Sequence, residues 1–324
     1  MSNRYSVALC TYNGEEYVIE QLQSILGQTI PPAQIVVSDD GSQDSTLELV
    51  DEFLKDKDVS YILTKNSGKH GVSSNFMNAL HLCTEEIIFT SDQDDIWKRN
   101  KAEVILNIYK NNSKALLVFS NGELVDSSLK PLGCDIWKAV GITAEKCKEG
   151  DWFHYLLKSC LVTGATMAFK QSLVKDVTDI PKEWLHDGWF SWLAVSQNGL
   201  VPCAEKLILY RQHSSNVVGM KPKFNIYSRF REWYANFSNI FTSHQKRYFR
   251  TLSLYQNIGS RFNPKQQNDL QECVAFWGKL SHLLEERKIS RVIYVLQSYK
   301  DGYYDKFYTG LRGAIRDIVV SLKL

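Results

Sequence analysis

The first 120 residues alternate short apolar strands with amphipathic helical segments, and this alternation limits the fold more than any other feature. The apolar runs are followed by segments with a helical pattern of apolar side chains. A β-α-β-α rhythm of this kind predicts an α/β fold with a mostly parallel sheet and helices on both faces. The predicted strands are Tyr5–Cys10, Gln34–Ser38, Val59–Thr64, Glu86–Thr90 and Ala115–Phe119.

Polar residues follow three of these strands directly. They are Thr11-Tyr12-Asn13, Asp39-Asp40-Gly41-Ser42 and Asp92-Gln93-Asp94-Asp95. Ligands of open parallel sheets bind at the carboxyl ends of the strands. These three segments are therefore the predicted site.

Asp92 and Asp94 are separated by one residue and come directly after an apolar strand. Two carboxylates so placed present oxygen ligands to one hard cation, Mn²⁺ or Mg²⁺, which such sites share with substrate phosphates. The alternative is a helix N-cap, and Asp95 is expected to act as one.

The segment from Asp39 to Ser42 has two interpretations. An aspartate here is able to accept a hydrogen bond from a base N–H or a ribose hydroxyl, and Gly41 permits a tight turn. The other interpretation is an ordinary strand-to-helix turn capped by Asp or Ser, with Ser42-Gln43-Asp44 opening the second helix.

Taken together, the motifs resemble family 2 of the glycosyltransferases over about residues 5–220. The resemblance is carried by Ala8-Leu-Cys-Thr-Tyr-Asn-Gly, Val37-Ser-Asp-Asp-Gly-Ser and Ser91-Asp-Gln-Asp-Asp-Ile-Trp. It implies the GT-A fold, an inverting mechanism and a divalent cation. The third motif, together with His186-Asp-Gly-Trp and Tyr210-Arg-Gln-His-Ser-Ser-Asn-Val-Val-Gly, most resembles bacterial rhamnosyltransferase-like members.

The resemblance implies roles for the nucleotide-binding residues. Thr11 and Tyr12 would hold a pyrimidine base, with Tyr12 stacking on it, and Asn13 is grouped with them. Asp39 would bond the base and Asp40 the ribose. Tyr12 has an alternative role as a packing residue at the helix entry.

The resemblance also implies a metal and phosphate site. Asp94 would be the main metal ligand, Asp92 would contact the metal or the ribose, and His213 would complete the site. Arg211 would bind phosphate. His213 and Arg211 have structural alternatives, the latter as a member of an ion pair.

The candidate general base is Asp187, since an inverting transfer needs one carboxylate to take the acceptor proton. A helix is predicted over His186–Val195, with Asp187 as its alternative N-cap. Trp189 and Trp192 are either a sugar platform or core. Gly164, in the strand-like run Val162–Phe169, is expected beside the donor sugar, or else marks a strand bend.

The charge distribution divides the chain near residue 220. Residues 1–220 carry 20 basic and 28 acidic residues, a net charge of −8, and residues 221–324 carry 18 and 8, a net charge of +10. We therefore predict a catalytic domain over 1–220 and a helical, basic extension over 221–324. The extension has an aromatic helical face at Tyr227, Phe230, Trp233, Tyr234, Phe237 and Phe241.

Three roles remain open for this extension: contact with a membrane surface, homo-oligomerisation, or packing on the catalytic domain. No nucleic-acid-binding motif accompanies its charge. The seven cysteines lack metal-site or disulfide-framework spacing, and no secretory or membrane-spanning segment is apparent. The expected location is the cytoplasm, including the inner face of the membrane.

The expected function is transfer of a hexose or deoxyhexose from a dTDP- or UDP-sugar to a glycan acceptor, in polysaccharide biosynthesis or protein glycosylation. The acceptor is a cell-surface glycan, a lipid-linked intermediate or a glycoprotein sugar. Rhamnose from dTDP-rhamnose is favoured by resemblance, with UDP-glucose or UDP-galactose as the alternative donor. A sugar nucleotidyltransferase and a non-catalytic sugar-nucleotide-binding module are less favoured, because the Gly-rich phosphate loop of the former is missing and the metal and base candidates are present.

Overall fold

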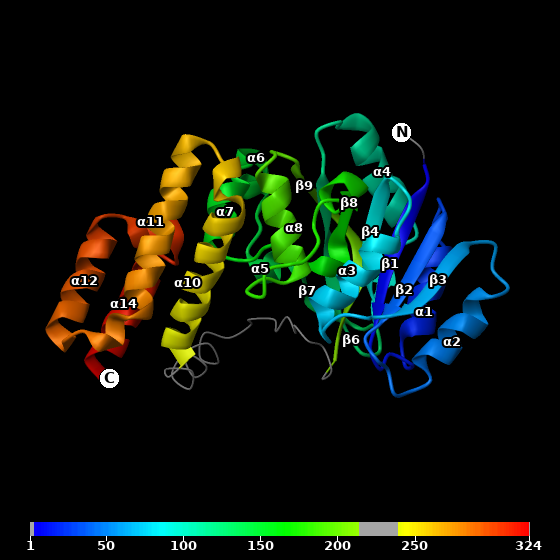
Figure 1. The fold of residues 1–324 in the computed structure, drawn as a ribbon, viewed down its shortest axis with the longest axis horizontal. Coiled ribbons are helices and arrows are strands. Elements are labelled where there is room, and N and C mark those ends of the chain that lie inside the picture. The colour runs from blue at the N-terminus through cyan, green and yellow to red at the C-terminus, as the bar shows by residue number, and fades with distance from the viewer. Residues whose placement is uncertain (1–2, 214–238, 324) are drawn as a thin grey trace. The chain divides into compact units, whose positions relative to one another are not determined.

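The computed structural model describes residues 3–213 and 239–323. Their contacts form two compact units (Figure 1). The first lies within Met1–Glu149 and Leu161–Pro222, and the second within Gly150–Cys160 and Lys223–Leu324. Residues 150–160 thus pack with the helical C-terminal residues, whereas the predicted division assigned them to the catalytic domain.

The first unit is built on one sheet with strand order β3-β2-β1-β4-β8-β6-β9-β5, and β7 pairs with β6. The long ladders between β1, β2, β3 and β4 and between β6 and β9 are parallel, and short antiparallel ladders join the rest. The predicted α/β fold is confirmed. The strands are β1 Tyr5–Thr11, β2 Gln34–Asp39, β3 Ser60–Lys65, β4 Ile87–Asp92, β5 Ile96–Trp97, β6 Leu117–Asp126, β7 Pro131–Asp135, β8 Met167–Lys170 and β9 Leu200–Gln212.

Every residue of β1 and β2 is buried, which explains their nearly continuous apolar sequence. Helices surround the sheet, and α3 packs on β1, β2 and α8 (Figure 1). The helices of this unit are α1 Val18–Leu26, α2 Thr46–Leu54, α3 Val72–Leu82, α4 Lys101–Asn111, α5 Ile136–Val140, α6 Ala144–Glu149 and α8 His186–Val195, with short 3-10 helices η1 Gly164–Thr166 and η2 Gln171–Leu173.

Two local predictions were wrong. The second helix begins at Thr46 rather than at Ser42, because the Ser42 hydroxyl is hydrogen-bonded to Asp39 and Asn13 and Asp44 accepts from Thr46. The run Val162–Phe169 is not one strand. Residues 164–166 form η1, in which Thr166 N–H donates to Thr163 O, and the strand begins only at Met167.

The second unit is entirely helical in the described residues. Its core is aromatic, and α11 begins at a capping box in which Asn263 and Gln266 satisfy each other's backbone N–H, with Pro264 in the first turn. The elements are α7 Trp152–Lys158, α10 Asn239–Ile258, η3 Gly259–Arg261, α11 Pro264–Ser281, η4 Leu283–Glu285, α12 Lys288–Lys300, α13 Tyr303–Phe307 and α14 Leu311–Lys323.

Of the predicted aromatic face, Phe241 is buried in α10. Tyr227, Phe230, Trp233, Tyr234 and Phe237 lie outside the described residues. Within the part of the chain that the structure describes, no helix has the length and apolar character needed to cross a bilayer.

Candidate active site

The parallel register brings the three predicted segments together. Thr11 lies opposite Asp39, and Cys10 lies opposite Asp92, so the carboxyl ends of β1, β2 and β4 meet at one edge of the sheet. This is the edge at which open α/β sheets bind ligands.

The Asp39 carboxylate is buried and accepts four hydrogen bonds from the protein. The donors are the N–H groups of Gly41 and Ser42 (2.9 and 2.7 Å) and the hydroxyls of Thr11 and Ser42 (2.7 and 2.5 Å). A carboxylate satisfied in this way holds the β2–α2 turn and has no oxygen facing a ligand. The expected base contacts of Asp39 and of the Thr11 hydroxyl do not fit this arrangement.

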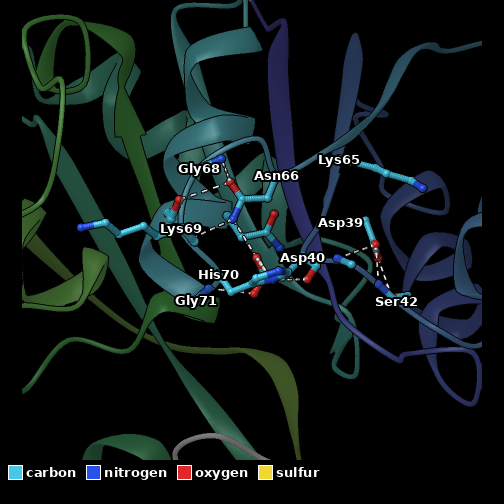
Figure 2. A network of polar contacts seen from close by, with 12 residues as sticks. Asp39, Asp40, Ser42, Lys65, Asn66, Gly68, Lys69, His70 and Gly71 are labelled. Atoms are coloured by element: carbon cyan, nitrogen blue, oxygen red, sulfur yellow. Dashed lines mark hydrogen bonds and ion pairs between the residues drawn. The ribbon is translucent and has the colours of Figure 1, made fainter.

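Asp40 instead organises the loop between β3 and α3. Figure 2 shows Asn66, His70 and Gly71 gathered around it. Its carboxylate accepts from Asn66 Nδ2 at 2.7 Å and from Gly71 N at 2.8 Å, and its carbonyl lies 2.9 Å from His70 Nδ1. Asp40 is only partly buried, so of the two aspartates it is the one placed to meet a nucleotide.

Tyr12 lies at the mouth of the site with 55% of its surface exposed. Its backbone is fixed from both sides by Gln93, whose Oε1 accepts from Tyr12 N at 2.8 Å and whose Nε2 donates to Tyr12 O at 3.0 Å. Asn13 has a left-handed φ of 48° and accepts from Gln43 N. The ring of Tyr12 is thus presented on a rigid turn, as base stacking requires.

Acidic side chains concentrate at the end of β4. Burial raises the pKa of Asp92 to about 7, and the nearby charges of Asp94 and Asp187 add to the rise. The candidate base on α8 therefore lies close enough to the β4 carboxylates to interact with them electrostatically.

Asp95 is not the expected N-cap of the next helix. That position belongs to Asn100, and Asp95 is buried, where Oδ1 accepts from Arg211 N at 3.0 Å. Burial raises the pKa of Asp95 and lowers that of the fully buried Lys101 to about 7. Lys101 Nζ donates to Ala165 O at 2.9 Å and lies 3.9 Å from the centre of the Trp97 ring.

His213 and Asp94 come together although 119 positions separate them. His213 Nε2 lies 2.9 Å from Asp94 Oδ2, and the imidazole stacks on Tyr17 with the ring centres 5.0 Å apart. The fold thus brings together the two residues for which the resemblance implies a shared metal site.

Arg211 is buried behind this pair and is engaged by the protein. Its Nε donates to Asp94 O at 2.8 Å, and its terminal nitrogens donate to Ser127 O and to Glu20 at 2.5 and 2.6 Å. Because its guanidinium is engaged by these protein groups, Arg211 stabilises the acidic turn, which is the segment Asp92–Asp95. The structure therefore favours the structural role of Arg211 over the expected phosphate contact.

Among residues 3–213 and 239–323, no group of three or more His, Cys, Asp or Glu side chains is arranged to hold a metal ion. The expected three-ligand set of Asp92, Asp94 and His213 is therefore not assembled as a cage. The charges of Asp94 and Asp187 nevertheless add to the raised pKa of Asp92, and a divalent cation beside Asp92 would oppose that rise. The oxygen-rich set fits a cation that takes one or two protein ligands and completes its shell with phosphates.

Asp187 lies in the first turn of α8, where its Oδ1 accepts from Gly188 N at 2.6 Å. Leu185, not Asp187, is the N-cap residue. Trp189 and Trp192 are buried, so they belong to the core and do not form a sugar platform.

The turn at Gly164 faces the start of α8. Its carbonyl accepts from Thr90 Oγ1 at 2.6 Å, and a Cβ at this position would lie 2.6 Å from His186 Nε2. His186 is buried against Phe76, with ring centres 4.0 Å apart, and neither ring nitrogen has a hydrogen-bond partner in the described structure. Burial lowers the pKa of His186 to about 3.

Three residues of the site were missed by the sequence analysis as contributors in their own right: Gln93, Lys101 and His186. Gln93 and His186 lie inside two of the motifs that carry the family resemblance, so their position in those motifs could have indicated them. Lys101 had no signal beyond its place near the acidic turn, because its partners Ala165 and Trp97 are brought together only by the fold.

Comparison with known proteins agrees with this geometry. Residues 6–130 match the family model described as glycosyl transferase family 2. The dTDP-rhamnosyl transferase RfbG of Shigella flexneri is 29% identical over 229 residues, covering 67% of this chain and 75% of that protein. An Escherichia coli UDP-Glc:alpha-D-GlcNAc-diphosphoundecaprenol beta-1,3-glucosyltransferase, WfgD, is 24% identical over 67% of this chain and 81% of its own length.

Two solved structures show the same GT-A fold. TarS residues 1–349 of S. aureus, in complex with UDP-GlcNAc, align with a TM-score of 0.55 and 17% identity over 94% of this chain and 89% of that one. The mannosyltransferase PcManGT of Pyrobaculum calidifontis, in complex with GDP-Man and Mn²⁺, aligns with a TM-score of 0.51 and 13% identity over 99% and 86%.

Proposed function

We propose that this protein is a metal-dependent, inverting transferase that moves a hexose or deoxyhexose from a nucleotide-diphosphate sugar to a glycan hydroxyl. The match of residues 6–130 to the model of glycosyl transferase family 2 supports this proposal. One observation carries the proposal: the charges of Asp94 and Asp187 both act on Asp92 at the carboxyl end of β4, where Gln93 also holds the backbone of the exposed Tyr12. Carboxylates for a cation, a carboxylate for a proton and a platform for a base are the parts that such a transfer needs.

The nucleotide is expected to lie across the ends of β1 and β2. The Tyr12 ring stacks on the base. Asp40 positions the β3–α3 loop through its hydrogen bonds to Asn66 and Gly71, and it also accepts a hydrogen bond from the base or the ribose. Asp39 contributes by holding the turn on which Asp40 stands.

Asp94 and His213 would hold the divalent cation, with Asp92 beside them contacting it or the ribose. When bound, the cation neutralises the charge that develops on the leaving nucleoside diphosphate. Arg211 keeps Asp94 in place through the Asp94 carbonyl and Glu20.

Asp187 is the proposed base. It takes the proton of the acceptor hydroxyl while that oxygen forms its bond to the anomeric carbon and the bond from that carbon to the diphosphate oxygen breaks. A single in-line displacement of this kind inverts the anomeric centre.

The favoured donor is dTDP-rhamnose, because a relative that aligns with this chain over 75% of the relative's length is named a dTDP-rhamnosyl transferase. UDP-glucose or UDP-galactose is the alternative, since another relative is named for UDP-Glc and for a diphosphoundecaprenol-linked acceptor. Because the acceptor in that relative's name is linked to diphosphoundecaprenol, a lipid-linked glycan is the first acceptor to test.

The experiment is a screen of dTDP-rhamnose, UDP-glucose and UDP-galactose for Mn²⁺- or Mg²⁺-dependent hydrolysis and transfer, with an EDTA arm. Asp187→Asn is expected to bind the preferred donor normally and to transfer about 10²–10⁴-fold more slowly. Wild-type transfer by this variant would place the base elsewhere, and the absence of donor binding by the wild-type protein would contradict the proposed function.

A further inference from the structure

Tyr17 lies where three elements of the site meet. It directly precedes α1, and its ring contacts Arg211, near the end of β9, and His213, which follows that strand. Those two residues in turn contact Asp94, which follows β4. A single aromatic side chain therefore joins the start of α1 to the proposed metal site.

Helix capping does not explain a tyrosine at this position. Tyr17 is the N-cap residue of α1, but its side chain makes no cap hydrogen bond. Helix N-caps favour small residues with a side-chain oxygen, or glycine, over large side chains. Burial does not explain the tyrosine either, because the residue is only partly buried. Its contacts with the end of β9 are therefore the feature that calls for an aromatic ring.

Arg211 holds the Tyr17 ring in place. The guanidinium carbon lies 4.5 Å from the ring centre, which is a cation–π distance. The guanidinium is itself fixed, because Nε donates to Asp94 O at 2.8 Å and Nη2 donates to Glu20 Oε2 at 2.6 Å. Glu20 lies in the first turn of α1, three residues after Tyr17, so both contacts attach Arg211 to the same end of that helix.

The Tyr17 ring in turn orients the His213 imidazole. The strand β9 ends at Gln212, so the ladder of the strand does not extend to His213. The imidazole stacks on Tyr17 with the ring centres 5.0 Å and the ring planes 27° apart. In this orientation His213 Nε2 lies 2.9 Å from Asp94 Oδ2.

The separation of these two atoms suits a cation that binds both. Adjacent ligands of an octahedral cation with bonds of about 2.1 Å lie about 3 Å apart. The 2.9 Å between His213 Nε2 and Asp94 Oδ2 is close to that value. Rotation of the imidazole away from Tyr17 would change this separation, so the position of the ring affects the affinity for the cation.

We infer that Tyr17 is a positioning residue of the metal site: its ring, held by Arg211, keeps the His213 imidazole beside Asp94 and so raises the affinity for the divalent cation. This role rests on the proposed function, because it presupposes a cation at Asp94 and His213. Tyr17 acts through His213 and does not itself bind the cation.

Mn²⁺ binding to the full chain tests this role. The free Mn²⁺ is followed by electron paramagnetic resonance during a titration, with dTDP present in one series and UDP in another. Tyr17→Leu should weaken Mn²⁺ binding by about three- to tenfold, which is the effect of losing one aromatic stack. Tyr17→Phe keeps the ring and should bind Mn²⁺ within about twofold of the wild type.

The matched control is Tyr61→Leu. Tyr61 is also partly buried and lies at the start of β3, where its hydroxyl donates to Asp51. Its loss should leave Mn²⁺ binding unchanged. In a second comparison, Tyr17→Leu is added to His213→Ala and should cause little further loss of Mn²⁺ binding, because its effect is transmitted by the imidazole. Circular dichroism verifies that each variant is folded.

Three results would overturn this role alone. They are equal Mn²⁺ affinity of Tyr17→Leu and the wild type, equal weakening by Tyr17→Phe and Tyr17→Leu, and an undiminished effect of Tyr17→Leu in the His213→Ala protein. The second would assign the effect to the hydroxyl, and the third would show that Tyr17 does not act through His213. Absence of Mn²⁺ binding by the wild-type protein in both series would contradict the proposed function as well.

Discussion

Asp39, the last residue of β2, and Asp40, which follows it, have different roles. Asp39 is saturated by four internal donors, whereas Asp40 fixes a neighbouring loop and remains partly exposed. The two side chains differ because successive side chains of a strand point to opposite faces of the sheet, so neighbours at the end of a strand have different surroundings. Identical residues in one motif therefore have different roles.

Lys101 is expected to stabilise the acidic turn. The substitution Lys101→Met removes the donor to Ala165 O and a buried cation whose charge stabilises the ionised forms of Asp92 and Asp95. We predict a loss of about 3 kcal/mol in the free energy of unfolding, measured with urea.

The control for this variant is Lys98→Met. The Lys98 side chain is partly exposed, at 38%, and its Nζ lies 3.7 Å from Glu123 Oε2, so removal of this surface ion pair should cost less than about 1 kcal/mol. Equal stability of the two variants would show that Lys101 does not hold the turn.

His186 predicts a pH dependence of stability. Its folded pKa of about 3 lies below the unfolded value of about 6.5, so its contribution is present above pH 6.5 and is lost as the pH falls toward 3. Between pH 7 and pH 5 the wild-type protein should lose about 2 kcal/mol from this residue. His186→Asn removes the titrating group, so its loss over the same range, measured by urea unfolding, should be smaller by that amount. An identical pH slope in the two proteins would contradict the assignment.

At the scale of elements, the start of α8 is positioned by its contact with η1. Thr90 holds the Gly164 carbonyl, and the missing side chain of Gly164 makes room for His186, the residue before the proposed base. The position of the proposed base therefore depends on a glycine more than 20 residues away in the sequence.

Gly164→Ala tests this contact. The added Cβ would lie 2.6 Å from His186 Nε2, so we predict a stability loss of about 1–3 kcal/mol and a lower turnover number. Adding His186→Ala to the same protein should recover part of both losses, because it removes the imidazole that the Cβ meets. Strictly additive losses in the double variant would show that the two residues are not coupled.

The sequence predicted β1 to β4, the first part of β6, the polar segments at the ends of β1, β2 and β4, and α8, because these depend on local apolar periodicity and on motifs. It did not predict β5, β7 or β9. It did not predict the partners of Arg211 or Lys101, since Glu20, Asp94 and Ala165 are brought to them only by the fold. The Asp94–His213 contact was expected only from family resemblance, because no spacing rule joins positions 119 apart.

At the scale of the whole molecule, α7 belongs to the helical unit despite its place in the middle of the chain. His154 lies between Asp151 and Asp269, at 2.7 and 2.9 Å, and Phe153 packs edge-on against Phe262 at 5.1 Å. The acidic first part and the basic last part of the chain are therefore not separable by one cut near residue 220.

We predict that a chain ending at residue 222 exposes the apolar side of α7. It should bind anilinonaphthalene sulfonate more strongly than the full chain, because Phe153 and its buried neighbours lose their partners. The control is the same chain with residues 150–160 replaced by a Gly/Ser linker, which should bind the dye weakly. Equal, weak dye binding by both chains would show that α7 packs independently of the C-terminal helices.

The proposed role of the carboxylates at the end of β4 is metal-dependent transfer from a nucleotide sugar. The most direct measurement is the rate of sugar transfer against Mn²⁺ or Mg²⁺ concentration for the wild-type protein, Asp94→Asn and the exposed control Asp58→Asn. EDTA should abolish transfer by the wild type and the control, the cation should restore it, and Asp94→Asn should stay about 10²–10³-fold slower at every concentration. Full transfer in EDTA, or a wild-type rate for Asp94→Asn, would rule out the proposed role of these carboxylates.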